Sequence, residues 1–431
     1  MTEHGTLAII GAGPKAVAVA AKASVLRSFG QSVPRIVALE SREVAGHWLY
    51  GGGWTDGQQR LGTSPEKDVG FPYRSTLLSG KGVALSEAIA RFSWQAYLVE
   101  NGLFADWVDR GRPNPKHQTW ARYLQWAAAK AQLEVIRAEA TSITCEDGGW
   151  RVWARTADGG QETVVADSLM ITGPGSADHV LLPDHPQVLS VSRFWGLVVR
   201  RELPESFQVA VIGGGETAAA VVNELIEHRE VGVVTVLSPN PTLYTRGESY
   251  FENSIYSDPA GWQALPLAER REVIRRTDRG VFSTHVQEEL LRDERIGHLR
   301  GRVAYAVDRD GRIDLMIRNT GGPDVMRSFD LVVDATGVRP LWFLDLFTQE
   351  ARDLVELSAG WPVTKERVEA VIAQDLSIAG MEPKLFLPGL AGLAQGAGFP
   401  NLSCLGLLAD RVLSGFVGEG PRQSLRSAAK A

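Results

Sequence analysis

Cysteine is scarce in this sequence. The 431 residues include two cysteines, Cys145 and Cys404, which lie far apart and form no C-x-x-C pair. A disulfide framework needs several paired cysteines, and a dithiol redox centre needs two that lie close together. The sequence therefore disfavours both a disulfide-stapled fold and a dithiol reductase, and it favours a reducing, cytoplasmic setting.

The sequence also lacks a net positive charge and long apolar runs. Lys and Arg number 45 against 51 Asp and Glu, which gives a formal net charge of -6. Such a chain has no global positive field that would bind a phosphate backbone, so nucleic acid is a poor candidate ligand. No stretch reaches the roughly 18 apolar residues that span a bilayer, and the first residues show no signal-peptide pattern. We expect a soluble protein with neither a nucleic-acid nor a membrane partner.

Metal-binding patterns are absent from the sequence as well. The eight histidines show no H-E-x-x-H or similar ligand spacing. No G-x-S-x-G motif is present that would place a serine nucleophile on a sharp turn. We therefore expect no bound metal and no serine hydrolase.

Glycine, in contrast, is abundant, with 45 residues where an average share of about 7% would give roughly 30. The first glycine cluster, Gly11-Ala12-Gly13-Pro14-Lys15-Ala16, follows an apolar run at 7–10 and precedes an alanine-rich helix pattern. A second apolar run at 36–39 ends at Glu40. In such a β-α-β unit the glycines admit a pyrophosphate to the helix N-terminus, and the acid binds a ribose hydroxyl. This unit predicts an FAD site.

The same pattern recurs about two hundred residues later. A strand pattern at 208–212 runs into Gly213-Gly214-Gly215-Glu216-Thr217-Ala218, followed by a helix pattern at 219–228 and a strand pattern at 233–237. Here the second strand ends at Ser238 instead of an acid, and Arg246 follows. An acid would repel a 2'-phosphate, whereas an arginine would bind it. The second unit therefore predicts an NADPH site.

The fold class that these patterns predict is α/β, with two Rossmann-like dinucleotide-binding domains and a small helical substrate-binding region. Apolar runs at 168–171 and 330–333 each end in a small-residue turn, where we expect the chain to pass between the domains. The FAD domain is expected to be discontinuous, at 1–195 and 330–418. The NADPH domain is expected at 196–329, with substrate-binding segments within 245–300, and a flexible tail at 419–431.

Two dinucleotides without a paired thiol leave a monooxygenase, a flavin oxidoreductase such as an NADPH oxidase or flavin reductase, or an electron-transfer partner. The residues then narrow these alternatives. The segment 60–74, RLGTSPEKDVGFPYR, together with Phe92-Ser93-Trp94-Gln95 and the second glycine turn, resembles the flavin-dependent lysine N6-hydroxylases of mycobactin and nocobactin biosynthesis. These belong to the class B N-hydroxylating monooxygenases, which act on lysine or ornithine.

The resemblance implies an FAD- and NADPH-dependent enzyme that hydroxylates L-lysine with O2 through a C4a-hydroperoxyflavin. The product would be N6-hydroxy-L-lysine, which siderophore assembly enzymes would use downstream for a hydroxamate siderophore. The resemblance also allows a homo-oligomer. Ornithine or another amine as substrate remains an alternative, as does an NADPH oxidase or flavin reductase.

The resemblance also implies roles for individual residues. Lys67 would lie beside the flavin and contact nicotinamide and substrate, Asn253 would hold the amino acid's α-groups, and Ser403 would lie near flavin and substrate. Asp278 stands where ornithine hydroxylases have asparagine. Each has a structural alternative: a surface lysine for Lys67, a helix or turn cap for Asn253 and Ser403, and a salt bridge for Asp278.

The expected cofactor contacts form two sets. The FAD set is Gly11, Gly13, Pro14, Lys15, Glu40, Trp48, Lys67, Gly398, Leu402 and Ser403. The NADPH set is Gly213, Gly215, Glu216, Thr217, Ser238, Arg246, Thr336 and Gly337. Separately, Trp120, Tyr123 and Trp126 share one helical face, which predicts burial in the core.

Overall fold

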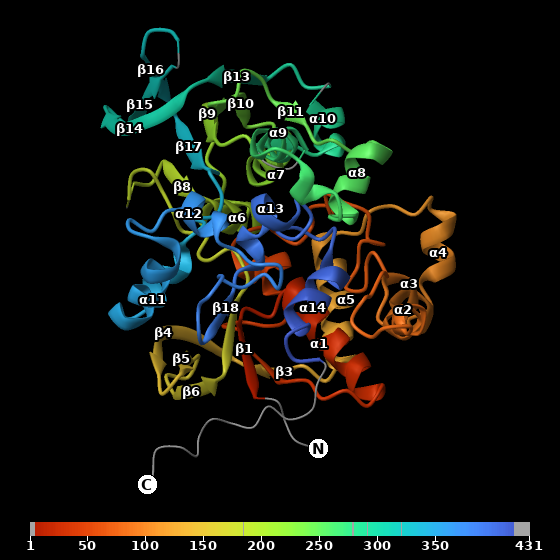
Figure 1. The fold of residues 1–431 in the computed structure, drawn as a ribbon. Coiled ribbons are helices and arrows are strands. Elements are labelled where there is room, and N and C mark those ends of the chain that lie inside the picture. Colours follow the sequence, from red (N-terminus) through yellow and green to blue (C-terminus); the bar gives the residue numbers. More distant parts are fainter. Residues whose placement is uncertain (1–4, 184, 278–279, 291, 320, 418–431) are drawn as a thin grey trace.

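The computed structural model describes residues 5–183, 185–277, 280–290, 292–319 and 321–417. Asp278 and the predicted tail at 419–431 lie outside the described residues. Within them the chain forms two parallel β-sheets, each covered by helices, together with smaller antiparallel sheets (Figure 1). The predicted α/β fold class with two Rossmann-like units is confirmed.

The first parallel sheet has the strand order β18-β7-β1-β2-β3. Its strands are short and apolar, and β1 and β7 are almost fully buried, as is usual for the strands of a parallel sheet in the interior of an α/β fold. The strands are β1 (Thr6–Ile10), β2 (Arg35–Leu39), β3 (Glu134–Ile136), β7 (Ser168–Ile171) and β18 (Lys384–Phe386). Residues from both ends of the chain thus build one sheet, since β18 pairs with β7.

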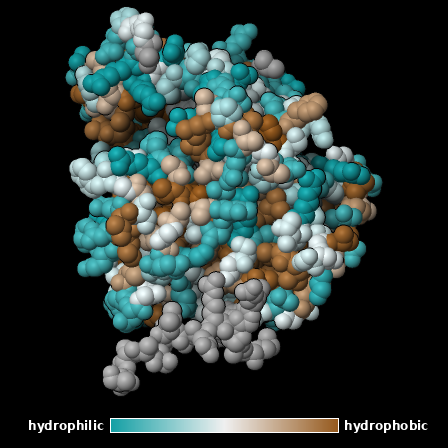
Figure 2. Space-filling view, viewed as in Figure 1, coloured by the Kyte–Doolittle hydropathy of each residue, from teal (hydrophilic) through white to brown (hydrophobic). Residues whose placement is uncertain are grey.

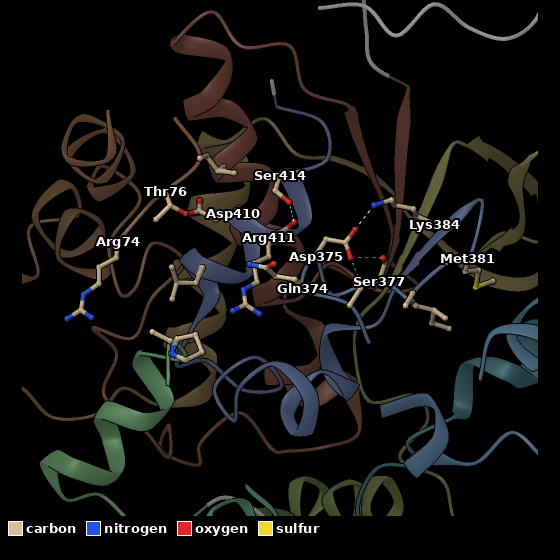
Figure 3. Close-up of a pocket in the computed structure, with 18 of the residues that line it drawn as sticks. Arg74, Thr76, Gln374, Asp375, Ser377, Met381, Lys384, Asp410, Arg411 and Ser414 are labelled. Atoms are coloured by element: carbon tan, nitrogen blue, oxygen red, sulfur yellow. Dashed lines mark hydrogen bonds and ion pairs between the residues drawn. The ribbon is translucent and has the colours of Figure 1, made fainter. Parts of the chain in front are cut away.

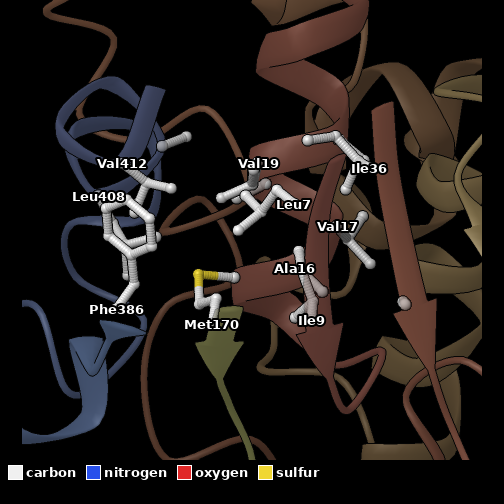
Figure 4. Packing of buried hydrophobic residues seen from close by; sticks show 14 of the residues in the cluster. Leu7, Ile9, Ala16, Val17, Val19, Ile36, Met170, Phe386, Leu408 and Val412 are labelled. Atoms are coloured by element: carbon white, nitrogen blue, oxygen red, sulfur yellow. The ribbon is translucent and has the colours of Figure 1, made fainter. Parts of the chain in front are cut away.

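Helices α1 (Pro14–Ser28) and α14 (Leu405–Leu413) pack together against the first sheet. Figure 4 shows the apolar side chains that fill this layer, with Leu7 and Met170 from the strands meeting Leu408 and Val412 from α14. A buried ion pair also joins the two helices, with Lys22 Nζ 2.6 Å from Asp410 Oδ1. The C-terminal helix is therefore an integral part of the first domain's core.

The second parallel sheet has the order β13-β10-β9-β17-β8. Its strands are β8 (Val188–Ser190), β9 (Ser206–Ile212), β10 (Val231–Ser238), β13 (Ile296–Arg300) and β17 (Leu331–Asp334). Helix α7 (Glu216–Leu225) follows the second glycine turn and buries its apolar face against β9 and β10. The second β-α-β unit forms as the glycine spacing predicts.

The predicted domain boundaries at 195/196 and 329/330 are wrong by one strand at each end. Strand β8 precedes residue 196 and helix α6 (Val191–Arg200) spans it, but both pack in the second layer. Strand β17 follows residue 329 but lies between β9 and β8. The reason is that β17 is buried on all four residues and pairs on both edges, so the second sheet needs it as a central strand.

Smaller elements surround the two layers. The antiparallel strands are β4 (Ala138–Glu146), β5 (Gly149–Thr156), β6 (Gln161–Ala166), β14 (Arg302–Arg309), β15 (Arg312–Arg318) and β16 (Val325–Phe329), and a parallel pair is β11 (Tyr244–Thr245) with β12 (Val281–Phe282). The remaining helices are α2 (Gly82–Ala90), α3 (Trp94–Glu100), α4 (Phe104–Asp109), α5 (His117–Lys130), α8 (Tyr250–Ser257), α9 (Leu267–Thr277), α10 (Thr284–Leu290), α11 (Gln349–Ala359), α12 (Lys365–Ala370) and α13 (Gly392–Gln395).

An aromatic cluster holds α3 and α5 together beside the first sheet. Trp120 and Tyr123 of α5 are fully buried, and Trp126 packs partly buried against Tyr97 at a ring distance of 5.5 Å. Trp94 of α3 meets Tyr123 edge-on at 5.6 Å. The predicted burial of the α5 face is confirmed, and the cluster forms an aromatic platform that contacts the segment before α2 through Val69 and Tyr123.

The outer surface mixes polar and apolar residues. Figure 2 shows hydrophilic and hydrophobic residues interspersed over the visible face. Among the described helices, none combines the length and apolar composition that a bilayer crossing requires.

We expect Leu408→Ala to lower the free energy of unfolding by about 2–5 kcal/mol, because it opens a cavity between α1 and α14. Leu357→Ala is the matched control, since Leu357 is 85% exposed on α11. Thermal melting of both variants beside the parent tests this. Equal shifts for the two variants would contradict the role of α14 in the core.

Candidate active site

Three of the predicted site residues meet at one point. The Lys67 ammonium donates a hydrogen bond to Asn253 Oδ1 at 2.6 Å, and its Nζ lies 3.5 Å from Ser403 Oγ. Asn253 belongs to α8, and Ser403 precedes α14, so the contacts join segments that are 186 and 336 residues from Lys67. The fold therefore brings these three predicted site residues together.

The local structure leaves Asn253 and Ser403 free for this contact. Ser249 begins α8 and forms a capping box with Glu252, so Asn253 is not the helix cap. The Asn253 Nδ2 instead donates to Glu248 O at 2.9 Å, which turns Oδ1 toward Lys67. Ser403 is buried, and no side-chain hydrogen bond caps α14. The capping alternatives for both residues are wrong.

Burial sets the protonation of Lys67. Burial, and secondly the positive charge of Arg246, lowers the pKa of Lys67 to about 8. An amine with this pKa still carries its proton at neutral pH, so Lys67 presents a cation to the cluster. The surface-lysine alternative is wrong, since this ammonium is largely withdrawn from water.

The first glycine turn lies where α1 begins. Gly11 has φ +93, and a Cβ at that position would lie 2.9 Å from Thr172 Oγ1, so the turn needs glycine there. Gly13 is the N-cap of α1, and a Cβ there would meet nothing within 4 Å. Pro14 occupies the first helical position, and the Glu40 carboxylate accepts the Ala12 N–H at 3.0 Å. The open space at Gly13 suits a phosphate at the helix N-terminus.

Two buried polar atoms near this turn lack a partner among the described residues. Trp48 Nε1 and His47 Nδ1 are both buried without a hydrogen bond in that part of the chain. The adjacent Ala45 N–H donates to Ala12 O, which ties their segment to the glycine turn. Buried polar atoms normally have a partner, so a bound polar cofactor fits this site.

The C-terminal members of the FAD set close the same region. Lys15 Nζ donates to Pro400 O at 2.7 Å, which ties α1 to the segment before Ser403. A Cβ at Gly398 would lie 2.0 Å from Tyr256 O, so glycine is required where this segment passes α8. Leu402 is half-buried beside Ser403.

The second glycine turn packs against the turn after β17. A Cβ at Gly213 would lie 2.3 Å from Ala335 O, and one at Gly215 would meet nothing nearer than 3.9 Å. Gly337 lies beside Thr217 Oγ1, and Thr336 Oγ1 donates to Asp334 Oδ1 at 2.7 Å. The free space at Gly215 again lies at a helix N-terminus, which fits a second pyrophosphate.

Ser238 and Arg246 have different partners among the contacts of the described residues. Ser238 is buried and its hydroxyl lies 3.0 Å from His298 Nε2. Arg246 Nη1 lies 3.4 Å from Gly62 O and 3.9 Å from the Glu216 carboxylate, near the Lys67 turn. Spacing along the chain suggested a phosphate ligand beside Ser238, whereas the fold places this arginine where the two domains meet.

A cavity of about 880 Å³ is lined in part by residues from α8 and α14. Figure 3 shows that its side chains come from separate segments, with Arg74, Arg411 of α14 and Asp375 among them. Ser257 and Leu407 line it, four residues after Asn253 and Ser403 respectively. Lys67, Asn253 and Ser403 do not line it, so this cavity is separate from their cluster.

Sequence reasoning missed the residues that hold Lys67 in place. Asp68 is buried and accepts hydrogen bonds from three donors, and Gly406 of α14 lies directly against the turn at Gly70. The signal for Asp68 was its place inside the apolar, glycine-containing stretch after Lys67. Gly406 had no signal, because its neighbour is far away in the chain.

Known proteins similar to this chain include lysine and ornithine monooxygenases. The family model described as L-lysine 6-monooxygenase/L-ornithine 5-monooxygenase matches residues 83–338. The chain belongs to this family. This lysine/ornithine monooxygenase family includes an L-lysine N6-monooxygenase of Mycobacterium sp. (strain MCS) that is 54% identical over 96% of this chain and 95% of that protein. The counterpart from Mycobacterium tuberculosis (strain H37Rv) is 53% identical over 95% of this chain and 94% of its own length.

A solved structure of the lysine/ornithine monooxygenase family supports the fold. The lysine monooxygenase NbtG from Nocardia farcinica matches with a TM-score of 0.87 and 52% identity, covering 96% of this chain and 100% of that chain. The ornithine N-hydroxylase KtzI of Kutzneria sp. 744 matches with a TM-score of 0.73 at 20% identity, which supports the fold alone. The resemblance to the lysine N6-hydroxylases is confirmed.

We expect Gly406→Ala to destabilise the protein by about 1–3 kcal/mol, because a Cβ there would lie 2.2 Å from Gly70 O and the backbone would have to shift. Gly415→Ala is the matched control, since its Cβ would meet only Lys384 Nζ, at 3.7 Å. Thermal melting compares the two variants. A melting temperature of Gly406→Ala equal to that of the parent would show that the turn and α14 are not in close contact.

Proposed function

We propose that this chain is an FAD- and NADPH-dependent monooxygenase that hydroxylates the N6 amine of L-lysine, supplying N6-hydroxy-L-lysine for a hydroxamate siderophore. The observation that carries the proposal is the hydrogen-bonded cluster of Lys67, Asn253 and Ser403, to which both domains contribute. Relatives at 53–54% identity over nearly the whole chain are named L-lysine N6-monooxygenase. Enzymes that assemble the siderophore would consume the product.

The residues around both glycine turns fit the two cofactors. The open space at Gly13 and the unpaired buried atoms of Trp48 and His47 suit FAD, which Gly398 and Ser403 would approach from the C-terminal side. The open space at Gly215 suits NADPH, with Thr217 and Gly337 beside it. A reduced flavin supplies oxygen activation when it is bound, and the protein contributes binding, orientation and exclusion of water.

The protein's own residues favour the reactive form of the substrate. A free lysine side-chain amine has a pKa near 10.4, so about 99.9% is protonated at pH 7 and cannot act as a nucleophile. The cationic Lys67, reinforced by Arg246, disfavours a second positive charge nearby. Asn253 would bind the amino acid's polar groups through its oriented amide. No acid–base triad is needed for this chemistry.

The thiols are unsuited to redox chemistry. Burial raises the pKa of Cys404 to about 12, and its Sγ lies 2.7 Å from Tyr256 O. Burial also raises the pKa of Cys145, and neither cysteine forms a disulfide. A thiol is reactive as its thiolate, so a disulfide reductase is disfavoured. An NADPH oxidase that does not oxygenate an amine is the competing function.

One assay separates the two functions. Purified protein with FAD and NADPH is incubated with lysine, with ornithine and without an amino acid, while NADPH oxidation, peroxide and hydroxylamine are measured. We expect hydroxylamine with lysine, in excess of that with ornithine. Peroxide without hydroxylamine under all three conditions would establish the NADPH oxidase instead.

We expect Lys67→Ala to retain FAD but to lower the fraction of consumed NADPH that yields hydroxylamine roughly tenfold or more, with peroxide rising in compensation. The reason is the loss of the cation and of the contacts to Asn253 and Ser403. Lys81→Ala is the control, because Lys81 is exposed just before α2. Undiminished hydroxylamine yield in Lys67→Ala would remove Lys67 from the site.

A further inference from the structure

The residue after Lys67 carries a buried carboxylate with unusually complete hydrogen bonding. Asp68 is 2% exposed. Its Oδ1 accepts from the Tyr73 hydroxyl at 2.7 Å and from the Gly70 N–H at 3.0 Å, and its Oδ2 accepts from the Trp94 N–H at 2.9 Å. No cation forms an ion pair with it among the described residues. A buried carboxylate is costly, so these three bonds must fix its position closely.

Two of the three donors, Gly70 and Tyr73, belong to the compact turn that follows Asp68. Tyr73 has φ +60, a backbone conformation that is uncommon for a residue with a bulky side chain. Its ring lies over Gly70, where a Cβ would be 2.6 Å from the ring. The hydroxyl at the far end of that ring is the one that bonds Asp68. The carboxylate thus holds the end of the turn against its start.

The same turn is attached to two other parts of the fold. The Val69 N–H donates to the Tyr123 hydroxyl at 3.2 Å, and that hydroxyl donates to Phe92 O at 3.0 Å, on the aromatic platform. On its other side, Phe71 O accepts the Gly406 N–H of α14 at 2.7 Å. Lys67 is therefore presented from a turn that Asp68 links to α3 and that touches the helix following Ser403.

We propose that Asp68 is a positioning residue for the amine substrate: its carboxylate holds the turn so that Lys67 meets Asn253 and Ser403. This inference rests on the proposed function. Asp68 itself touches neither of those partners, so it acts through Lys67. Loss of the carboxylate should loosen the placement of the Lys67 ammonium while leaving both glycine turns intact.

Protonation of Asp68 makes this role depend on pH. A role in packing alone would not produce that dependence. Burial raises the pKa of Asp68 to about 6, while its hydrogen bonds oppose the rise. The titratable groups that face it are the phenols of Tyr73 and Tyr123, whose pKa values burial raises, so both stay neutral. Above pH 6 the ionised carboxylate accepts all three bonds, and below pH 6 added protons weaken them. Lys67, with a pKa of about 8, keeps its charge through this range.

The test compares Asp68→Asn with the parent FAD-loaded enzyme. We expect Asp68→Asn to bind FAD and be reduced by NADPH at the parental rate, but to show roughly a fivefold rise in the KM for lysine and a lower yield of hydroxylamine per NADPH. The ratio of the two KM values should be largest above pH 6 and fall toward one below it. Asp106→Asn is the control, since Asp106 pairs with Arg110 on the surface.

If Asp68→Asn does not fold, the same measurements are made on Tyr73→Phe. It removes one donor to the same carboxylate, so we expect a smaller KM rise in the same direction. A parental KM for lysine in whichever variants fold, or a KM ratio independent of pH, would overturn the positioning role. If the parent itself forms no hydroxylamine, the proposed function fails, which is a separate result.

Discussion

The contact between the Lys67 ammonium and the Asn253 amide organises the site, because it joins segments that lie far apart in the chain. Lys67 lies on a turn of the first domain, Asn253 on a helix connected with the second, and Ser403 on the segment leading into the last helix. A partly buried ammonium needs hydrogen-bond acceptors. Asn253 and Ser403 supply these acceptors from two segments far from Lys67 in the chain.

Close backbone approach makes this meeting possible. Gly398 lets the C-terminal segment pass the Tyr256 carbonyl, and Gly406 lets α14 lie on the turn after Lys67. Gly213 does the same between the second glycine turn and the end of β17. The glycine excess therefore serves two purposes: Gly13 and Gly215 leave open space at helix N-termini, and others remove side chains where segments touch.

The two dinucleotide turns could be predicted from sequence because every part of each motif lies within about forty consecutive residues. Strand, glycine turn, helix and strand appear in that order, and local periodicity is enough to place them. The domain boundaries could not be predicted as well, since β17 joins the second sheet through pairing with β9 and β8, far away in the chain. Arg246 illustrates the same difficulty: its spacing from Ser238 suggested one neighbour, and the fold supplied Gly62 and Glu216.

The amino-acid sequence by itself determined the two Rossmann-like units, the aromatic face of α5, the absence of a paired thiol and, through the segment around Lys67, the resemblance to the lysine hydroxylases. Only the tertiary structure decided that Lys67 meets Asn253 and Ser403, that Asp68 closes the turn beside it, and that Arg246 lies near this turn. The physical reason is the distance along the chain over which each kind of interaction acts. Backbone preferences and hydrophobic periodicity act over a few residues, whereas these contacts form between groups that only the packed core brings within hydrogen-bond distance.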